Sequence, residues 1–294
     1  MPDAERLDVV MRLHDARRTG ELARAVFSLV GQAYRPLHVL LCVQRFTRGM
    51  LLDVQDALAP LLAMDGAPDL EVLNHEAPLP QDARAALADR GMAAAAGRYL
   101  AFLDYDDTLY PEAYALLVAR LRAGGAAIAF AGIAVKHAAI EDGLLHVQAK
   151  RTRHWPGRTL RDLFRENCCP LHSFVIDRTR LPPGLGFDTT LTRLEDYDFL
   201  LRLCAARRSD FALIDTVVGD YYFKSDGSNA TPVGVAATPE NLAAWERARA
   251  AIAARRRTTP VAAEVQRDAG LRRPVPGLTI AGLLDRLEPA GTPS

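Results

Sequence analysis

The stretch Gly97-Arg98-Tyr99-Leu100-Ala101-Phe102-Leu103-Asp104-Tyr105-Asp106-Asp107 decides the fold. Its apolar run, residues 99–103, predicts a buried β-strand that ends in three carboxylates within four residues. A strand in an open α/β sheet delivers its C-terminal end to the ligand crevice, where crowded carboxylates repel one another unless a cation holds them. Hard oxygen ligands suit Mg²⁺ or Mn²⁺, which also bind phosphate oxygens. The first hypothesis is therefore a metal site for a phosphorylated substrate.

The composition is that of a soluble globular protein. The chain has 294 residues, 49% of them apolar, and 36 basic residues balance 36 acidic ones, so we expect no nucleic-acid partner. It has no run of about 18 apolar residues, and the polar start Met1-Pro2-Asp3 does not resemble a signal peptide. Because its four cysteines form no C-x-x-C pair, we expect reduced thiols and a cytoplasmic location.

Strands and helices alternate along the first hundred residues. Apolar runs predict strands over 7–13, 37–43, 70–73 and 99–103, and helical spacing predicts helices over 19–30, 51–64 and 81–96. This order predicts an α/β fold whose central sheet is Rossmann-like, mostly parallel and covered by helices on both faces.

The rest of the chain continues with shorter elements. Helices are predicted over 112–122, 159–165, 192–206, 241–254 and 278–287, strands over 126–135, 172–176, 211–214 and 217–223, a hairpin over 135–149, and a loop over 225–237. We divide the chain into residues 1–112 and 113–237, the two halves of one domain, and residues 238–294, a C-terminal helical extension with a tail.

Four segments, in order, resemble the family 2 glycosyltransferases of the GT-A fold. Residues 28–36 are similar to the family's S-x-x-x-Q-x-Y segment, and residues 89–102 resemble its R-N-x-G stretch with the following strand. Residues 103–107 match its D-x-D-D metal motif, and residues 194–198 match its E-D-x-D motif. The resemblance covers residues 7–230 and implies a nucleotide-sugar-binding half, 1–112, and an acceptor-binding half, 113–237. The implied reaction is an inverting transfer of a sugar from a nucleotide to a hydroxyl acceptor. Bacterial surface glycan assembly is the implied setting.

The resemblance also implies roles for the acidic motifs. A Mn²⁺ or Mg²⁺ ion would bridge Asp106 and the donor diphosphate, and Asp104 would contact the nucleotide ribose or a metal-bound water. Asp196 would be the general base that deprotonates the acceptor hydroxyl. Glu195 is the alternative base, or an acceptor ligand.

Further donor contacts are expected at Gln44, Arg84, Asp89 and Lys224. Gln44 stands where the family usually has an aspartate that touches the nucleobase, and an amide can still pair with a base edge. Asp89 replaces the usual asparagine before Gly91, and Lys224 would bring positive charge to the phosphates. The donor would be a UDP-, GDP- or dTDP-sugar. After the first strand, Arg12-Leu13-His14-Asp15 stands in place of the family's P-x-Y-N segment.

The acceptor, a saccharide or a lipid-linked saccharide, is expected to contact Trp155, His172 and Asp198. Each assignment has an ordinary alternative. Trp155 with its neighbouring arginines would otherwise be a surface loop, His172 a structural hydrogen-bonding residue, and Asp198 part of an acidic helix start favoured by the helix dipole. Residues 255–257 are either a solvated basic helix end or a peripheral contact with an anionic surface of the inner membrane.

Two other functions compete with the transferase. Residues 104–109 also fit D-x-D-x-T-L, the first motif of haloacid-dehalogenase-like phosphatases, in which Asp104 would be the nucleophile and Asp106 the acid/base. That motif normally follows a first strand, whereas about a hundred residues precede it here. The third reading is a non-catalytic glycosyltransferase-like domain that binds a nucleotide or a partner.

Overall fold

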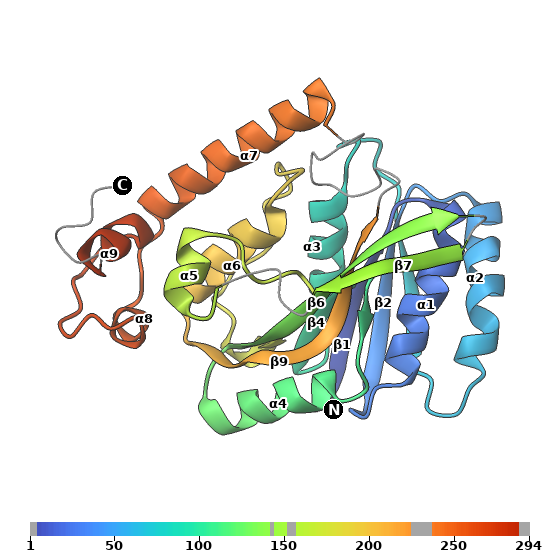
Figure 1. Cartoon of the computed structure of the whole chain (residues 1–294), viewed down its shortest axis with the longest axis horizontal. Coiled ribbons are helices and arrows are strands. Elements are labelled where there is room, and N and C mark those ends of the chain that lie inside the picture. Colours follow the sequence, from blue (N-terminus) through green and yellow to red (C-terminus); the bar gives the residue numbers. More distant parts are fainter. Residues whose placement is uncertain (1–4, 142–143, 152–156, 225–236, 288–294) are drawn as a thin grey trace.

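The computed structural model describes residues 5–141, 144–151, 157–224 and 237–287. Its nine described strands form one sheet in the order β3-β2-β1-β4-β8-β6-β9-β5, with β7 paired to β6 (Figure 1). Helices cover both faces of this sheet, so the expected α/β fold is confirmed. None of the described helices combines the length and the apolar character that a membrane crossing needs.

The N-terminal half alternates strands and helices as expected. The strands β1, β2, β3 and β4 pair in parallel, with β1 between β2 and β4. The elements are β1 (Leu7–Leu13), η1 (Ala16–Arg18), α1 (Thr19–Val30), β2 (Leu37–Gln44), α2 (Arg48–Leu62), β3 (Asp69–His75), α3 (Arg84–Ala94) and β4 (Tyr99–Asp104). The carboxyl ends of these parallel strands therefore lie at one edge of the sheet.

The second half is a mixed sheet. β8 pairs antiparallel with both β4 and β6, and β9 runs parallel to β6. The elements are β5 (Thr108–Leu109), α4 (Ala113–Gly124), β6 (Ile128–Glu141), β7 (Leu144–Arg151), α5 (Leu160–Arg165), β8 (Phe174–Asp177), η2 (Arg178–Arg180), α6 (Glu195–Ala206), β9 (Ser209–Lys224), α7 (Pro239–Thr258), α8 (Ala263–Asp268) and α9 (Ile280–Leu287).

Alternation along the strands separates two apolar cores. In β4, Leu100 and Phe102 face a core completed by α3, α5, α6 and the C-terminal helices. Tyr99, Ala101 and Leu103 face the opposite core, completed by α1, α2 and α4. A strand buried on both faces reads as an unbroken apolar run, which is why this strand was visible in the sequence.

Several elements differ from expectation, four of them for a clear physical reason. One continuous strand, β9, replaces the two predicted over 211–214 and 217–223, because its pairing with β6 absorbs register shifts around Gly132. α6 begins at Glu195 instead of residue 192, because Leu194 adopts a left-handed backbone conformation with φ 58°. α2 begins at Arg48, where the Thr47 hydroxyl caps it. The short helix α8 carried too few apolar residues for its periodicity to be recognised.

A buried carboxylate joins the start of β1 to the start of β4. Asp8 Oδ2 accepts hydrogen bonds from the backbone amides of Ala96 and Gly97, at 2.6 and 2.7 Å. The chain passes so close that a Cβ atom on Gly97 would lie 2.4 Å from the carbonyl oxygen of Arg6. Glycine is therefore required directly before the strand that carries the acidic motif.

We expect Gly97→Ala to lower the free energy of unfolding by about 1–3 kcal/mol, because a methyl group must displace backbone that cannot move away. Chemical denaturation of both proteins measures the difference. Gly20→Ala is the matched control, since its Cβ would meet nothing within 4 Å and alanine favours the helix by roughly 0.5–1 kcal/mol. Equal stability of the wild type and Gly97→Ala would contradict this account.

Candidate active site

A cleft of about 710 Å³ opens at the carboxyl ends of β1 and β4. It is walled by segments far apart in sequence, which bring together acidic groups from β4 and α6, basic groups from β1 and α3, and one face of α7. Among its lining residues are Arg12, Arg84, Asp104, Glu195 and Asp196. The sequence-predicted acidic motifs thus meet in one cavity.

Aromatic packing fixes the start of α6 beside the end of β4. Phe102 in the middle of β4 contacts Phe187 and Phe199, with ring centroids 5.3 and 6.3 Å away. Phe187 and Phe199 stack on each other at 4.5 Å. Because Phe199 lies one turn after Glu195, this cluster carries the acidic first turn of α6 to the cleft.

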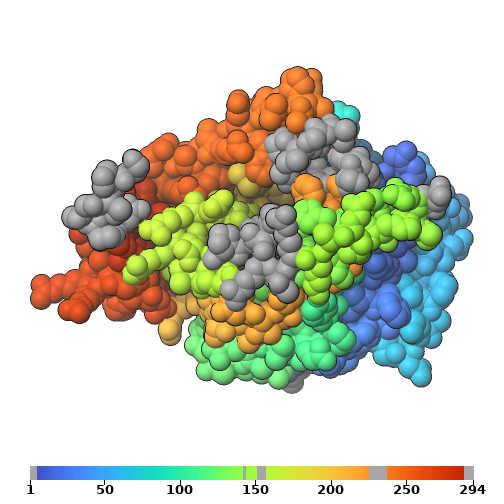
Figure 2. Space-filling model, viewed as in Figure 1, coloured from blue at the N-terminus to red at the C-terminus, as the bar shows by residue number. Residues whose placement is uncertain are grey.

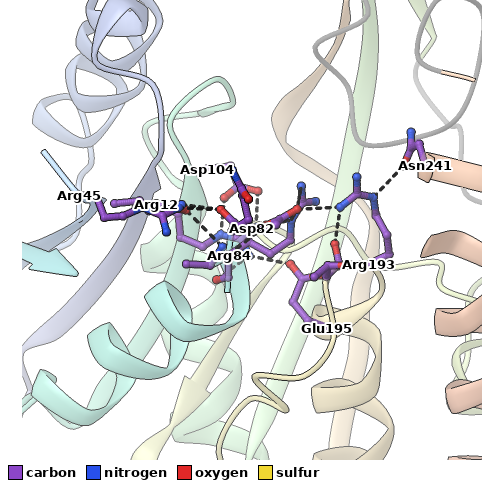
Figure 3. Close-up of polar contacts among 12 residues, drawn as sticks. Arg12, Arg45, Asp82, Arg84, Asp104, Arg193, Glu195 and Asn241 are labelled. Atoms are coloured by element: carbon purple, nitrogen blue, oxygen red, sulfur yellow. Dashed lines mark hydrogen bonds and ion pairs between the residues drawn. The ribbon is translucent and has the colours of Figure 1, made fainter. Parts of the chain in front are cut away.

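Arg12, at the end of β1, connects the two acidic motifs (Figure 3). Its guanidinium binds both carboxylate oxygens of Asp104, at 2.8 and 2.7 Å, and Oε1 of Glu195 at 2.8 Å. The Arg12 and Glu195 side chains are only 12% and 5% exposed. Burial raises the pKa of Asp104, but the charge of Arg12 outweighs that effect and holds it below its ordinary value.

Lys224, at the end of β9, binds the second carboxylate of the motif. Its ammonium lies 2.8 Å from Asp106 Oδ2 and 2.8 Å from Glu21 Oε1. Burial and the neighbouring charges of Asp107 and Asp104 raise the pKa of Asp106 to about 6, although Lys224 opposes the shift. Negative charge is therefore crowded at Asp106 even with the lysine in place.

Asp107 and His172 form a buried pair at the floor of the cleft. His172 Nδ1 lies 3.2 Å from Asp107 Oδ2, and Asp107 Oδ1 accepts the amide of Tyr222. Burial would lower the pKa of His172, but the charges of Asp107, Asp104 and Asp106 raise it overall. His172 lines the cleft, as its predicted acceptor role requires, and its imidazole also orients Asp107.

The structure distinguishes the two candidate bases. Glu195 is engaged with Arg12, whereas Asp196 has a hydrogen bond from the amide of Tyr197 at 2.7 Å and faces the cleft. Burial and the charge of Glu195 raise the pKa of Asp196 to about 6, against the effect of Arg12. A carboxylate with a raised pKa is a better proton acceptor than one paired with a guanidinium.

The donor set at the end of β4 fits a divalent cation. Asp104 and Asp106 offer hard oxygens, and the crowding that raises the pKa of Asp106 is the kind that a cation relieves. Over the described residues, no group of three or more His, Cys, Asp or Glu side chains is arranged to hold a metal ion. This agrees with a site of one or two carboxylates completed by substrate phosphates and water.

Arg84 lines the cleft, but two of the other predicted donor residues are engaged elsewhere. Gln44 donates to the carbonyl of Gln81 at 2.7 Å and accepts the amide of Ala83 at 3.2 Å, so its amide joins β2 to the segment before α3. Asp89 accepts the amide of Phe187 at 2.9 Å. Neither Gln44 nor Asp89 is among the described residues that line the cleft.

One predicted acceptor residue, Asp198, is not brought to the cleft, and another lies outside the described residues. Asp198 is buried and pairs with Arg202 and Arg255, at 2.7 and 2.6 Å, which gives it a structural role in place of the predicted acceptor contact. Trp155 lies outside the described residues. Arg255 is thereby turned inward, so residues 255–257 are not a uniformly solvated basic run.

Sequence analysis missed several cleft residues. Arg12 could have been recognised from the sequence, because it is the single charged residue in the otherwise apolar strand segment 9–13. Arg193 joins Asp82, at 2.8 Å, to Asn241 at the start of α7 (Figure 3), and no sequence pattern indicated this contact. The α7 residues line the cleft because of tertiary packing, which the local sequence of the helix does not indicate.

The sequence matches the family model described as Glycosyl transferase family 2 over residues 56–175. This match confirms the resemblance inferred from the motifs, over the part of the chain that it covers. The matched region contains the D-x-D-D motif and ends before α6. No curated protein matches the chain.

Solved structures share the fold. The 1–349 fragment of S. aureus TarS, also solved with UDP and with UDP-GlcNAc, has 12% identity and a TM-score of 0.51, covering 74% of this chain and 60% of the fragment. The mannosyltransferase PcManGT from Pyrobaculum calidifontis, solved with GDP-Man and Mn²⁺, has 15% identity and a TM-score of 0.51, covering 75% and 59%. Both are GT-A glycosyltransferases, and this chain spans about 60% of their length.

We expect Arg12→Gln to lower the free energy of unfolding by about 3 kcal/mol, because it leaves the buried Glu195 and the partly buried Asp104 without their cation. Chemical denaturation at neutral pH measures the loss. Arg17→Gln is the control, since Arg17 pairs with Asp15 on the surface with 89% of its side chain exposed. An equal effect of the two substitutions would show that the Arg12 bridge does not stabilise the fold.

Proposed function

We propose that this glycosyltransferase, with its family 2 region, moves a sugar from a nucleotide-sugar donor to an acceptor hydroxyl with inversion and with the help of a divalent cation. One observation carries the proposal. Asp104 at the end of β4 and Asp107 just after it line one cleft together with Glu195 and Asp196 of α6. Arg12 bridges Asp104 and Glu195. This is the arrangement in which a donor and an acceptor could meet between a phosphate-binding edge and a base.

The donor side is assigned to the end of β4. Asp106, with Asp104, would hold Mn²⁺ or Mg²⁺, which when bound supplies positive charge to the leaving diphosphate. Lys224 and Arg84 add protein charge, since Lys224 already contacts Asp106 and Arg84 lines the same cleft. UDP-, GDP- and dTDP-sugars are the candidate donors, and the structures solved with UDP-GlcNAc and GDP-Man support the first two.

The acceptor side is assigned to the first turn of α6. Asp196 removes the proton from the acceptor hydroxyl as the bond to the anomeric carbon forms. Glu195 acts as a positioning residue, because its bond to Arg12 fixes the turn from which Asp196 projects. Asp196 attacks no carbon itself, so the acceptor oxygen enters from the face opposite the leaving diphosphate and the configuration inverts.

The proposed donor and acceptor sides correspond to successive parts of the chain. Residues 1–112 contribute the donor side, residues 113–237 the acceptor side, and residues 238–294 a helical extension that places α7 over the cleft. The acceptor is a saccharide or a lipid-linked saccharide, and bacterial surface glycan assembly at the cytoplasmic side of the inner membrane is the proposed setting. The phosphatase alternative has less support, because the family model that matches the segment carrying its motif is that of a glycosyltransferase.

Nucleoside diphosphate with Mn²⁺ should raise the melting temperature by roughly 5 °C at a hundredfold excess over the dissociation constant. Differential scanning fluorimetry with UDP, GDP and dTDP identifies the nucleotide. EDTA and Asp106→Asn should each remove the Mn²⁺-dependent part, whereas Asp56→Asn on the exposed face of α2 should retain it. A shift that EDTA leaves undiminished would refute the assigned metal role.

Transfer should decline as the pH falls through about 6, because Asp196 must be deprotonated to act as a base and its pKa is raised to about that value. Below it, kcat/KM should fall tenfold for each pH unit. Asp196→Asn should lower kcat by about 10²–10⁴-fold while leaving the nucleotide-induced thermal shift in place. A profile that stays flat to pH 5 would argue that another group is the base.

A further inference from the structure

One face of α7 lines the end of the cleft beyond Asp196. Trp245, Arg249, Ile252 and Arg256 all border the cavity, and their spacing of four, three and four residues puts them on a single helical face. Figure 2 shows α7, in orange, along the upper edge of the molecule above α5. This helix lies outside the region that matches the family model.

The two arginines of this face are positioned by aromatic rings. The guanidinium of Arg249 lies 5.6 Å from the centroid of Trp245. That of Arg256 lies 5.6 Å from the centroid of Tyr197, donates to the Tyr197 hydroxyl at 2.7 Å and also contacts the carbonyl of Arg165. Cation–π contacts hold a guanidinium in place without neutralising its charge.

Neither arginine pairs with a carboxylate in the part of the chain that the structure describes. Three other cleft arginines differ, since Arg12 pairs with Asp104 and Glu195, and Arg84 and Arg193 both pair with Asp82. Moreover, Arg256 Nε is buried and has no hydrogen-bond partner among the described residues. An unmade bond of this kind favours a ligand that accepts it.

The charges along the cleft are therefore unequal. At the α7 end, Arg249 and Arg256 share the cavity wall with one described carboxylate, that of Glu166. At the β4 end, the basic groups are matched by acidic partners. An anionic group entering the cleft is attracted to the α7 end and repelled by Asp104 and Asp196.

We propose that the α7 face is an acceptor subsite for a saccharide that carries a phosphate group, which Arg249 and Arg256 bind while the acceptor hydroxyl reaches Asp196. The proposal rests on the proposed function. The α7 face lies near the proposed base, because Arg256 is held by Tyr197, the residue that directly follows Asp196. An acceptor anchored at one end by its phosphate would present a defined hydroxyl to the base.

The test is isothermal titration of the full chain, saturated with UDP and Mn²⁺ so that the probes do not occupy the donor site. The probes are N-acetylglucosamine 1-phosphate and uncharged N-acetylglucosamine. We expect the phosphorylated sugar to bind at least about tenfold tighter. Arg249→Gln should abolish the difference, and Arg247→Gln, an exposed arginine that does not line the cleft, should preserve it.

Equal affinities of the wild type for the two sugars would overturn the subsite, as would an equal loss in Arg247→Gln. A separate assay tests the proposed function: it measures hydrolysis of UDP-sugars and GDP-sugars by the wild type and by Arg247→Gln. Hydrolysis without phosphate discrimination would therefore refute the subsite alone. A third probe, the same sugar on a diphosphate with a short prenyl tail, separates two sources: tighter binding supports a lipid-linked acceptor, and equal binding supports a soluble one.

Discussion

The ion-pair bridge from Asp104 through Arg12 to Glu195 is the interaction on which the site depends. It joins the end of a central strand to the start of a helix 91 positions further along the chain, at N–O distances of 2.7 and 2.8 Å. Without a cation between them, the two buried carboxylates would repel each other and open the cleft. The same guanidinium therefore stabilises the fold and sets the distance between the donor and acceptor sides.

Burial determines how each acidic group behaves. Asp104 and Asp106 stand two residues apart, yet Arg12 lowers the pKa of the first while crowding raises that of the second to about 6. Glu195 and Asp196 also differ, since Glu195 is bound by Arg12, whereas burial and the charge of Glu195 raise the pKa of Asp196 to about 6. Adjacent carboxylates with different environments can take different chemical roles. The identity of the local cation, and not the motif alone, makes this distinction.

Short sequence patterns predicted those features of the structure that depend on residues close together in the chain. The apolar run of β4 was readable because a strand buried on both faces requires apolar residues at every position. Asp104 and Asp106 were singled out because carboxylates follow that run directly, and Asp196 because its motif resembles that of the family. Arg12, Arg193 and the α7 face were missed, since their partners lie up to 183 positions away and no periodicity encodes such contacts. Gln44 and Asp89 were expected to meet a donor, and the structure shows their polar groups bound to backbone.

The left-handed conformation of Leu194 has a consequence for how the enzyme could evolve. A residue with a β-carbon at φ 58° costs about 1–2 kcal/mol, and it stands directly before the two acids of α6. A glycine there would relieve the cost and also give the turn more freedom. Retaining leucine keeps a rigid hinge at the expense of thermal robustness, so selection for heat tolerance and selection for turnover would pull this one position in opposite directions.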